Sequence, residues 1–275
     1  MDYKIIASDL DGTLFNSSHE ISEKNMAAIK WLYDNGYYFV PSSGRAFNEM
    51  PDVLKEHPLI RYYINSDGGV VYDKKEDKSY QLTMPQKVSN KVLDVLYNHK
   101  INMMLHADTV SYVDLDLHSE EEYKACNFSK SWIDFVFEMN IPKADFKNFA
   151  YSHEAIELFC VFFEKPEDIE KCKEIFAGMP EVLTAQSNKY NLEIFSSKAG
   201  KGNALMLLAD ILGVDRRATI AVGDSTNDMT MVKMAGLGLA MANAVDELKA
   251  NANETICDNN SDAIDYIVER YIKND

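Results

Sequence analysis

Three short polar segments each follow an apolar stretch of the chain, and a fourth precedes a helix; this pattern constrains the fold more than any other feature. The apolar stretches at residues 3–8, 37–40 and 218–222 have the length and β-branched content of buried strands. In open α/β sheets, ligands lie beyond the carboxyl ends of the strands. The polar segments are therefore candidates for a ligand site: residues 9–13, 43–45, 201–202 and 223–228.

The first polar segment carries two acidic residues, Asp9 and Asp11. Side chains two positions apart on an extended chain project to the same side. Two carboxylates that lie so close repel each other unless a cation sits between them, and Mg²⁺ prefers carboxylates together with substrate phosphate oxygens. A magnesium site is one interpretation. The other is a solvated Asp-Gly turn in which Thr13 caps the next helix.

A second acidic cluster favours the magnesium interpretation. Residues 218–222 form another strand pattern that stops at Gly223, and Asp224 and Asp228 follow it. If this strand and the first are neighbours in one parallel sheet, these carboxylates lie at the same sheet edge as the first pair. The segment after residues 37–40 would add a hydroxyl and a backbone N–H there, and Lys201 would add a positive charge just before a helix.

In their order along the chain, these segments resemble the haloacid dehalogenase superfamily. The resemblance is to its Cof-type, sugar-phosphatase-like branch of subfamily IIB, which carries a large C2-type cap. Asp-x-Asp-Gly-Thr, Ser-Gly-Arg, Lys-Gly-Asn-Ala-Leu and Gly-Asp-x-x-Asn-Asp occur in family order, and the match covers the whole chain. The resemblance implies the following roles: Asp9 as nucleophile, Asp11 as general acid and base, Ser43 and Lys201 as phosphate ligands, and Asp224 as a magnesium ligand.

The chemistry of these residue types agrees with the roles that the resemblance implies. A carboxylate that attacks phosphorus gives an aspartyl-phosphate, which divides one difficult hydrolysis into two easier displacements. Mg²⁺ bound by Asp9, the backbone carbonyl of Asp11 and Asp224 would neutralise the anions, and Lys201 would balance the charge of the transferred oxygens. Asp11 must be protonated to release the alcohol and ionised to activate water, so its environment should differ from that of Asp9.

Further residues are expected to support this site. Donors to the phosphate oxygens would be the Ser43 hydroxyl, the Asn227 amide, and the backbone N–H groups of Leu10 and Gly44. Asp228 would orient Lys201 or a metal-bound water rather than bind the metal, and Ser225 could take either role. Arg45 could grip phosphate with two hydrogen bonds or form a structural salt bridge.

Length and charge limit the alternatives. At 275 residues, the chain is long enough for two domains. A net charge of −16 and an isoelectric point near 4.8 argue against binding nucleic acid or an anionic membrane. The sequence shows no signal peptide and no apolar run of membrane-spanning length, so we expect a cytoplasmic protein of undetermined oligomeric state. The cysteines lack the close spacing of zinc sites or disulfide frameworks: Cys126, Cys160, Cys172 and Cys257.

The architecture predicted from the patterns is α/β, with a Rossmann-like parallel core formed by residues 1–83 and 190–275. Residues 84–189 are predicted to form an inserted α+β domain, which the resemblance identifies as a C2-type cap that closes on substrate and selects the leaving group. Local predictions are a helix capped by Ser22 with Met26, Ile29, Leu32 and Tyr33 on one face, a helix over 119–139, and a strand over 155–164.

Two segments are open to more than one interpretation. Residues 65–69 stand where members of the family usually have a shorter Asn-Gly-Ala turn, and we interpret them as a plain hairpin turn. The aromatic residues between Trp132 and Phe149 could line a pocket for a ring-bearing substrate, but core packing is the favoured interpretation.

Three functions remain open at this point. The leading hypothesis is a Mg²⁺-dependent hydrolase of small phosphate monoesters, such as sugar phosphates or related metabolites. The second is a phosphotransferase or phosphomutase that uses the same aspartyl-phosphate. The third is a sensor of phosphorylated metabolites without catalysis, which the presence of both Asp9 and Asp11 disfavours, because binding alone requires no acid/base carboxylate. The sequence does not identify the substrate, because specificity would lie in the cap.

Overall fold

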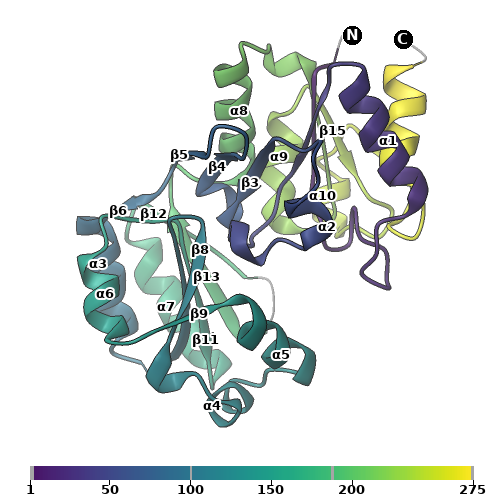
Figure 1. The fold of residues 1–275 in the computed structure, drawn as a ribbon. Coiled ribbons are helices and arrows are strands. Elements are labelled where there is room, and N and C mark those ends of the chain that lie inside the picture. Colours follow the sequence, from purple (N-terminus) through teal and green to yellow (C-terminus); the bar gives the residue numbers. More distant parts are fainter. Residues whose placement is uncertain (1–2, 100, 187–188, 274–275) are drawn as a thin grey trace. The chain divides into compact units, whose positions relative to one another are not determined.

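The computed structural model describes residues 3–99, 101–186 and 189–273 (Figure 1). The chain divides into two compact units. The core unit comprises Met1–Gly44, Pro51–Tyr80 and Gly200–Asp275, and the insert unit comprises Arg45–Met50 and Gln81–Ala199. The predicted limits of an independently folded cap, residues 84–189, stay a prediction.

The core unit is built on a parallel sheet with the strand order β16-β15-β14-β1-β2 among the described residues. The first strand pairs with β14 on one side and β2 on the other, so that Ser8 lies opposite both Val222 and Pro41. The three strands predicted around the site are therefore adjacent, and their carboxyl ends meet at one edge. The bounds are β1 Ile5–Ser8, β2 Tyr38–Pro41, β14 Thr219–Gly223, β15 Leu237–Ala240 and β16 Glu254–Thr255.

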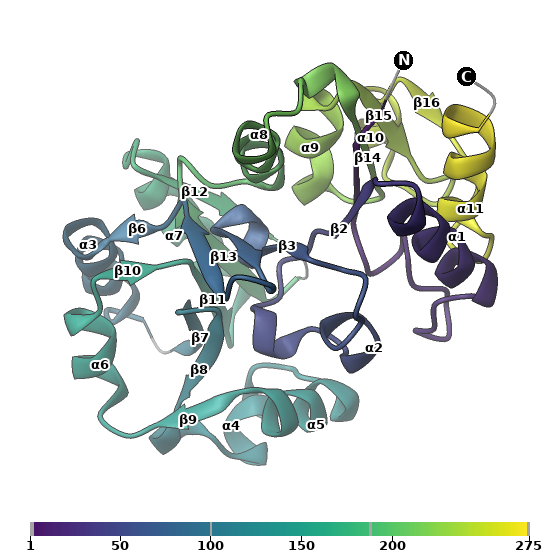
Figure 2. The ribbon, with the colours of Figure 1, turned by 45° about the horizontal axis from the view of Figure 1, so that its top comes forward.

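Helices cover both faces of this sheet. Figure 2 shows α8 and α9 on one side and α1 and α11 on the other, an arrangement that agrees with the contacts of α9 with β14 and of α1 with α11. This is the Rossmann-like α/β architecture predicted from the sequence. The bounds are α1 Glu23–Asp34, α2 Asp52–Lys55, α8 Lys201–Leu212, α9 Met229–Met234, α10 Asp246–Lys249 and α11 Ala263–Ile267, which continues as a π-turn at Val268–Ile272.

Helix α1 begins where the sequence predicts, because the Ser22 side chain accepts the N–H of Asn25. The predicted apolar face is wrong at one position, since Tyr33 is 53% exposed. Asn25 lies on the buried face instead, where its side-chain oxygen accepts the N–H of Ile264 at 2.9 Å. Asn25 can be buried because an N–H group at the start of α11, far along the chain, satisfies its side-chain oxygen.

A second, antiparallel sheet of the core unit has the order β3-β4-β5. It continues from the end of β2, because Ser42 bridges to Ile64 and the N–H of Ser43 donates to the Ile64 carbonyl at 2.9 Å. The turn between β3 and β4 is thereby brought beside Ser43. The bounds are β3 Tyr62–Asn65, β4 Val70–Asp73 and β5 Lys78–Gln81.

A bidentate ion pair anchors this second sheet, and its removal should destabilise the protein in a pH-dependent way. Arg61 donates to both oxygens of the buried Asp73 at 2.9 and 2.7 Å. Burial alone would raise the pKa of Asp73, but the hydrogen bonds from Arg61 and from two backbone N–H groups lower it. We expect Asp73→Asn to cost about 2 kcal/mol of unfolding free energy at pH 7.

Because the pKa of Asp73 is lowered in the folded state, its stabilising effect is complete above the unfolded-state pKa near 3.8. It is lost as the pH falls through the folded-state pKa. Urea unfolding of wild type and Asp73→Asn should therefore give a constant difference above about pH 5 that narrows below about pH 4. A difference that stays the same at pH 3 would contradict this assignment.

The insert unit contains a six-stranded sheet with the order β12-β13-β11-β7-β8-β9 among the described residues. Its pairs are antiparallel except β8 with β9, so the predicted α+β character is confirmed. A short pair, β6 with β10, lies beside helix α3. The bounds are β6 Met84–Pro85, β7 Ile101–Ala107, β8 Val110–Asp114, β9 Ile141–Lys143, β10 Ala155–Ile156, β11 Leu158–Phe163, β12 Val182–Ala185 and β13 Asn191–Ser196.

Apolar clusters form on both faces of this sheet. One cluster joins it to α3, α6 and α7, and the other joins it to α4 and α5. Helices α3 and α6 lie side by side in Figure 1. The bounds are α3 Gln86–Leu96, α4 Glu120–Ala125, α5 Lys130–Met139, α6 Phe146–Ser152 and α7 Pro166–Ala177.

Two predicted elements of the insert unit are broken in the structure. The helix predicted over 119–139 is two helices, because Asn127 adopts a left-handed φ of 62° and Ser129 caps a new helix through the N–H of Trp132. The strand predicted over 155–164 is interrupted at Glu157, which turns from β10 into β11. Glu157 is buried because its carboxylate accepts the N–H of Thr109 at 2.7 Å.

The aromatic stretch from Trp132 to Phe149 is divided between core and surface. Phe146 is buried in the cluster of α3, α6 and α7. Trp132 is partly exposed and lines an open cavity of about 280 Å³ together with Phe128 and Phe162. Within the described ranges, no helix combines the length and apolar character needed to cross a membrane.

Candidate active site

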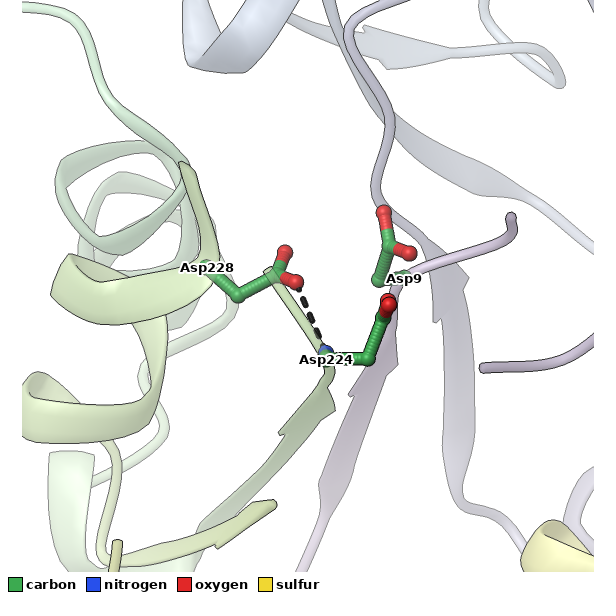
Figure 3. Close-up of side chains that lie close together, drawn as sticks. All are labelled: Asp9, Asp224 and Asp228. Carbon is green, nitrogen blue, oxygen red and sulfur yellow. Dashed lines mark hydrogen bonds between the residues drawn. The ribbon is translucent and has the colours of Figure 1, made fainter. Parts of the chain in front are cut away.

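Three carboxylates lie close together at the edge of the parallel sheet that the carboxyl ends of its strands form. The N–H of Asp9 donates to the Val222 carbonyl at 3.0 Å, which places the end of β1 beside the end of β14. One carboxylate oxygen from each of Asp9, Asp224 and Asp228 lies within 4.8 Å of the others. Figure 3 shows Asp9 and Asp224 at the ends of the two neighbouring strands, and Asp228 on the helical turn Thr226–Asp228 beside them. The proximity predicted from the ends of two strands is thus present in the structure.

Burial makes this cluster unfavourable without a compensating cation. Asp9 is 7% exposed and Asp224 is half-buried. Burial raises the pKa of Asp9 well above its usual value, and the charge of Asp228 raises it further, although Lys201 acts in the opposite direction. Burial and Asp228 also raise the pKa of Asp224. A divalent cation would relieve this repulsion, and carboxylate oxygens are the ligands that Mg²⁺ prefers, so the residues fit a magnesium ion.

Lys201 supplies the positive charge inside the cluster. It is the first residue of α8 and is fully buried, and its Nζ donates to Asp9 Oδ1 at 2.6 Å and to Asp228 Oδ1 at 2.7 Å. Burial alone would lower the pKa of Lys201, but the carboxylates of Asp228, Asp9 and Asp67 outweigh burial and raise it. The Lys201 ammonium is therefore held between two carboxylates at the centre of the site.

Asp228 organises the loop that carries Asp224. Its Oδ2 accepts the backbone N–H groups of Asp224 and Ser225, each at 3.0 Å, while Oδ1 accepts from Lys201. A Cβ on Gly223 would lie 2.4 Å from the Asp228 carboxylate, so only glycine allows this close approach. Both oxygens of Asp228 are thus committed to positioning the loop and the lysine, and Ser225 takes part through its backbone N–H.

The turn after β1 separates the two acidic residues of the first motif. Asp9 is buried, whereas the side chain of Asp11 is 47% exposed and has His19 Nδ1 at 3.9 Å from Oδ1. Gly12, with φ of 81°, packs so closely on Asp224 that a Cβ would lie 2.5 Å from Oδ2. Thr13 donates to Asp224 Oδ1 at 3.1 Å rather than capping a helix. The two carboxylates therefore occupy different environments.

The predicted phosphate-binding groups surround a residue that sequence reasoning missed. The side chain of Leu10 is fully buried, so only its backbone is available to a ligand. Asn227 donates to Asp67 Oδ1 at 3.1 Å, and a Cβ on Gly44 would lie 3.3 Å from both Asp67 oxygens. The carbonyl of Ser43 accepts the N–H of Asp67 at 3.2 Å. Residues 65–69 do form the predicted hairpin turn between β3 and β4, but the turn also carries a buried carboxylate beside the candidate site.

Arg45 belongs to the insert unit, although it follows Gly44 directly. Its guanidinium lies 5.2 Å from the centre of the Phe135 ring and reaches the Glu49 carbonyl at 3.5 Å. The segment continues with Asn48, which donates to the Met139 carbonyl at 2.6 Å and accepts the N–H of Ser111 at 2.8 Å. These contacts explain why the segment packs with the insert unit. Both roles predicted for Arg45, a grip on phosphate and a structural salt bridge, stay predictions.

Comparisons with known proteins identify the family. Residues 6–268 match the model of the haloacid dehalogenase-like hydrolases. A putative phosphatase of Buchnera aphidicola is 32% identical over 88% of this chain and 87% of its own length. A 5-amino-6-(5-phospho-D-ribitylamino)uracil phosphatase of Bacillus subtilis is 28% identical over 98% of each chain. The solved structure of a haloacid dehalogenase-like hydrolase from B. subtilis is 26% identical, with a TM-score of 0.80 over 98% of this chain and 100% of the other.

The chain belongs to the haloacid dehalogenase-like hydrolase family, as the parallel sheet and the order of its motifs indicate. Within that family it is an enzyme of the phosphatase class, in line with relatives that cover nearly all of its length.

Proposed function

We propose that this protein is a Mg²⁺-dependent phosphatase that hydrolyses small phosphate monoesters through an aspartyl-phosphate on Asp9. The observation that carries the proposal is the buried arrangement in which Asp9 shares one ammonium with Asp228 and lies beside Asp224. A nucleophilic carboxylate, a fixed cation and a further acidic residue at one point are what transfer of a phosphoryl dianion requires.

In the first step, an oxygen of Asp9 forms a bond to phosphorus while the bond to the leaving alcohol breaks. Asp11 donates a proton to the departing oxygen. Its exposed side chain suits this role, because the carboxyl group must exchange protons with solvent. In the second step, Asp11 takes a proton from water as the water oxygen attacks phosphorus. Inorganic phosphate leaves and the Asp9 carboxylate is restored.

Mg²⁺ held by Asp9, Asp224 and the backbone carbonyl of Asp11 would supply charge neutralisation. Lys201 would balance the charge of the transferred oxygens. Ser43, Asn227 and the backbone N–H groups of Leu10 and Gly44 would donate to those oxygens. We assign Asp228 to the positioning of Lys201, because both of its oxygens are engaged by protein groups.

The substrate is proposed to be a small phosphorylated metabolite. The B. subtilis relative is named for a phosphate ester at the end of a ribityl chain joined to a uracil ring, which is a sugar-alcohol phosphate with a ring on the leaving group. We propose that the inserted domain, residues 84–189, selects among such leaving groups, because the core motifs address only the phosphate.

The proposal is tested by measuring inorganic phosphate release, with Mg²⁺ or with EDTA, over sugar phosphates, sugar-alcohol phosphates, nucleotides, flavin mononucleotide and pyridoxal phosphate. Magnesium-dependent release from at least one ester is the expected result. Transfer of the phosphoryl group to an added alcohol without phosphate release would indicate a phosphotransferase. Binding without turnover of any ester would indicate a sensor.

Removal of Asp224 should weaken metal binding specifically. We expect Asp224→Ala to raise the Mg²⁺ concentration needed for half-maximal activity by at least about tenfold, because a direct carboxylate ligand is lost. The thermal unfolding midpoint of wild type should rise with Mg²⁺, and that of the variant should respond much less. Glu247→Ala, which removes an exposed acidic residue of α10, is the control and should behave as wild type. An unchanged Mg²⁺ requirement in Asp224→Ala would rule out this ligand.

A further inference from the structure

Asp67 lies in a turn that joins three parts of the core unit. Ser66, Asp67 and Gly68 have φ values of 52°, 49° and 83°, a left-handed conformation that strains residues other than glycine. The N–H of Asp67 donates to the Ser43 carbonyl at 3.2 Å, and its carbonyl accepts the N–H of Gly200 at 3.0 Å. The turn is thereby fixed between the segment of Ser43 and the residue that precedes Lys201.

The turn also packs closely against the start of α8. A Cβ on Gly68 would lie 2.3 Å from the Gly200 carbonyl oxygen, so the two backbones are in direct contact. Strained backbone persists only where the surrounding structure fixes it, and it is concentrated at functional sites. The Asp67 side chain is therefore carried by a strained turn of the kind found at functional sites.

The Asp67 side chain is directed into the site. The residue is 2% exposed, and its carboxylate packs on Gly44 while Oδ1 holds the amide of Asn227 at 3.1 Å. Its Oδ2 has no hydrogen-bond partner among the described residues. A buried carboxylate oxygen is costly to leave unsatisfied, so stability alone does not account for an acidic residue at this position.

The charge of Asp67 also acts on the phosphate-binding cation. Nζ of Lys201 donates to Asp9 and Asp228, and Asp67 adds a third negative charge near the same ammonium. In the proposed reaction Asp9 carries the phosphoryl group during part of each cycle. Asp67 and Asp228 then remain as the carboxylates that hold Lys201 charged and in place.

We propose that Asp67 is a positioning residue for phosphate binding, which acts by orienting the Asn227 amide. It neither attacks phosphorus nor binds the metal, and its effect reaches the substrate through Asn227. This inference rests on the proposed phosphatase function, because it assigns a role within that site.

The test uses Asp67→Gly, which removes the carboxylate while glycine adopts the left-handed backbone without strain, so that the fold is retained. We expect KM and the inhibition constant of inorganic phosphate to rise about tenfold, with a smaller change in kcat, because binding of the phosphoryl group is weakened. Asp67→Asn keeps the acceptor at Oδ1 and should restore both constants to within about threefold of wild type. Asp77→Gly makes the same exchange at an exposed left-handed aspartate of the β4–β5 turn and is the control.

A double-mutant cycle with Asn227→Ala separates positioning through Asn227 from an independent effect. The double variant Asp67→Gly/Asn227→Ala should bind phosphate no more weakly than Asn227→Ala alone, because the two residues act as one unit. Fully additive losses would overturn the proposal, as would an Asp67→Gly enzyme with both constants within twofold of wild type. A wild-type protein that releases no phosphate from any ester would instead refute the proposed function.

Discussion

Replacement of Asp9 by asparagine is expected to lower the rate of phosphate release by at least about a thousandfold. The amide oxygen is a poor nucleophile and cannot form the acyl-phosphate, while the size and hydrogen-bonding geometry of the side chain are kept. Steady-state phosphate release at saturating Mg²⁺ is the measurement.

The same variant should remain folded. Asp9 lies in a buried group of three carboxylates, so removal of one charge reduces their repulsion in the absence of metal, and Lys201 keeps its ion pair with Asp228. The thermal unfolding midpoint in EDTA should therefore be no lower than that of wild type. If Asp9→Asn kept a tenth or more of the wild-type rate, the substitution would raise the activation free energy by at most about 1.4 kcal/mol. Asp9 would then not be the nucleophile.

Replacement of Lys201 by methionine should abolish activity and also destabilise the protein. The ammonium is fully buried and bonded to two carboxylates, so methionine leaves Asp9 and Asp228 buried beside an apolar group. Removing one partner from a buried ion pair costs about 3–5 kcal/mol. Urea unfolding in EDTA measures this loss, and phosphate release measures the loss of activity.

Added Mg²⁺ should return part of the stability of Lys201→Met, because the ion neutralises the same carboxylates, but it should not restore turnover. Lys233→Met, at an exposed position of α9, is the matched control and should change the unfolding free energy by less than about 0.5 kcal/mol. A Lys201→Met protein as stable as this control would show that the buried charge is not held as the structure indicates.

The neighbours in the parallel sheet could be predicted from the sequence because they depend on local patterns. Asp9 and Asp224 each follow a short apolar strand, and parallel strands end at a common edge. The position of Lys201 could be predicted for a similar reason, since it directly begins a helix. Predicting these positions requires only the alternation of the strands, the points at which the strands end, and the point at which the helix begins.

The role of Asp67 could not be predicted in this way. Its turn has the composition of an ordinary hairpin, and its burial arises because Gly200, Gly44 and Asn227 approach from distant parts of the chain. The departure from the family's usual turn was the one available signal. Different environments for Asp9 and Asp11 were expected on chemical grounds, but the close packing of Gly12 on Asp224 in the turn after β1 is a tertiary contact that local patterns do not predict.

The contacts of Arg45 and its segment could not be predicted from local sequence patterns either. Its segment is held by backbone groups of Met139 and Ser111, which are roughly 60–90 positions away along the chain. The break between α4 and α5 depends on the left-handed conformation of Asn127, a residue type that tolerates this conformation without requiring it.

The central claim is that Asp9 carries the phosphoryl group, and rapid acid quenching of a turning-over reaction tests it most directly. Wild type with Mg²⁺ and its preferred ester should yield a peptide containing Asp9 with the added mass of one phosphoryl group, labile to hydroxylamine, and Asp9→Asn should yield none. The claim would be contradicted if wild type released phosphate and no phosphorylated Asp9 peptide were found in either wild type or Asp11→Asn. That result would indicate direct attack by water on the ester.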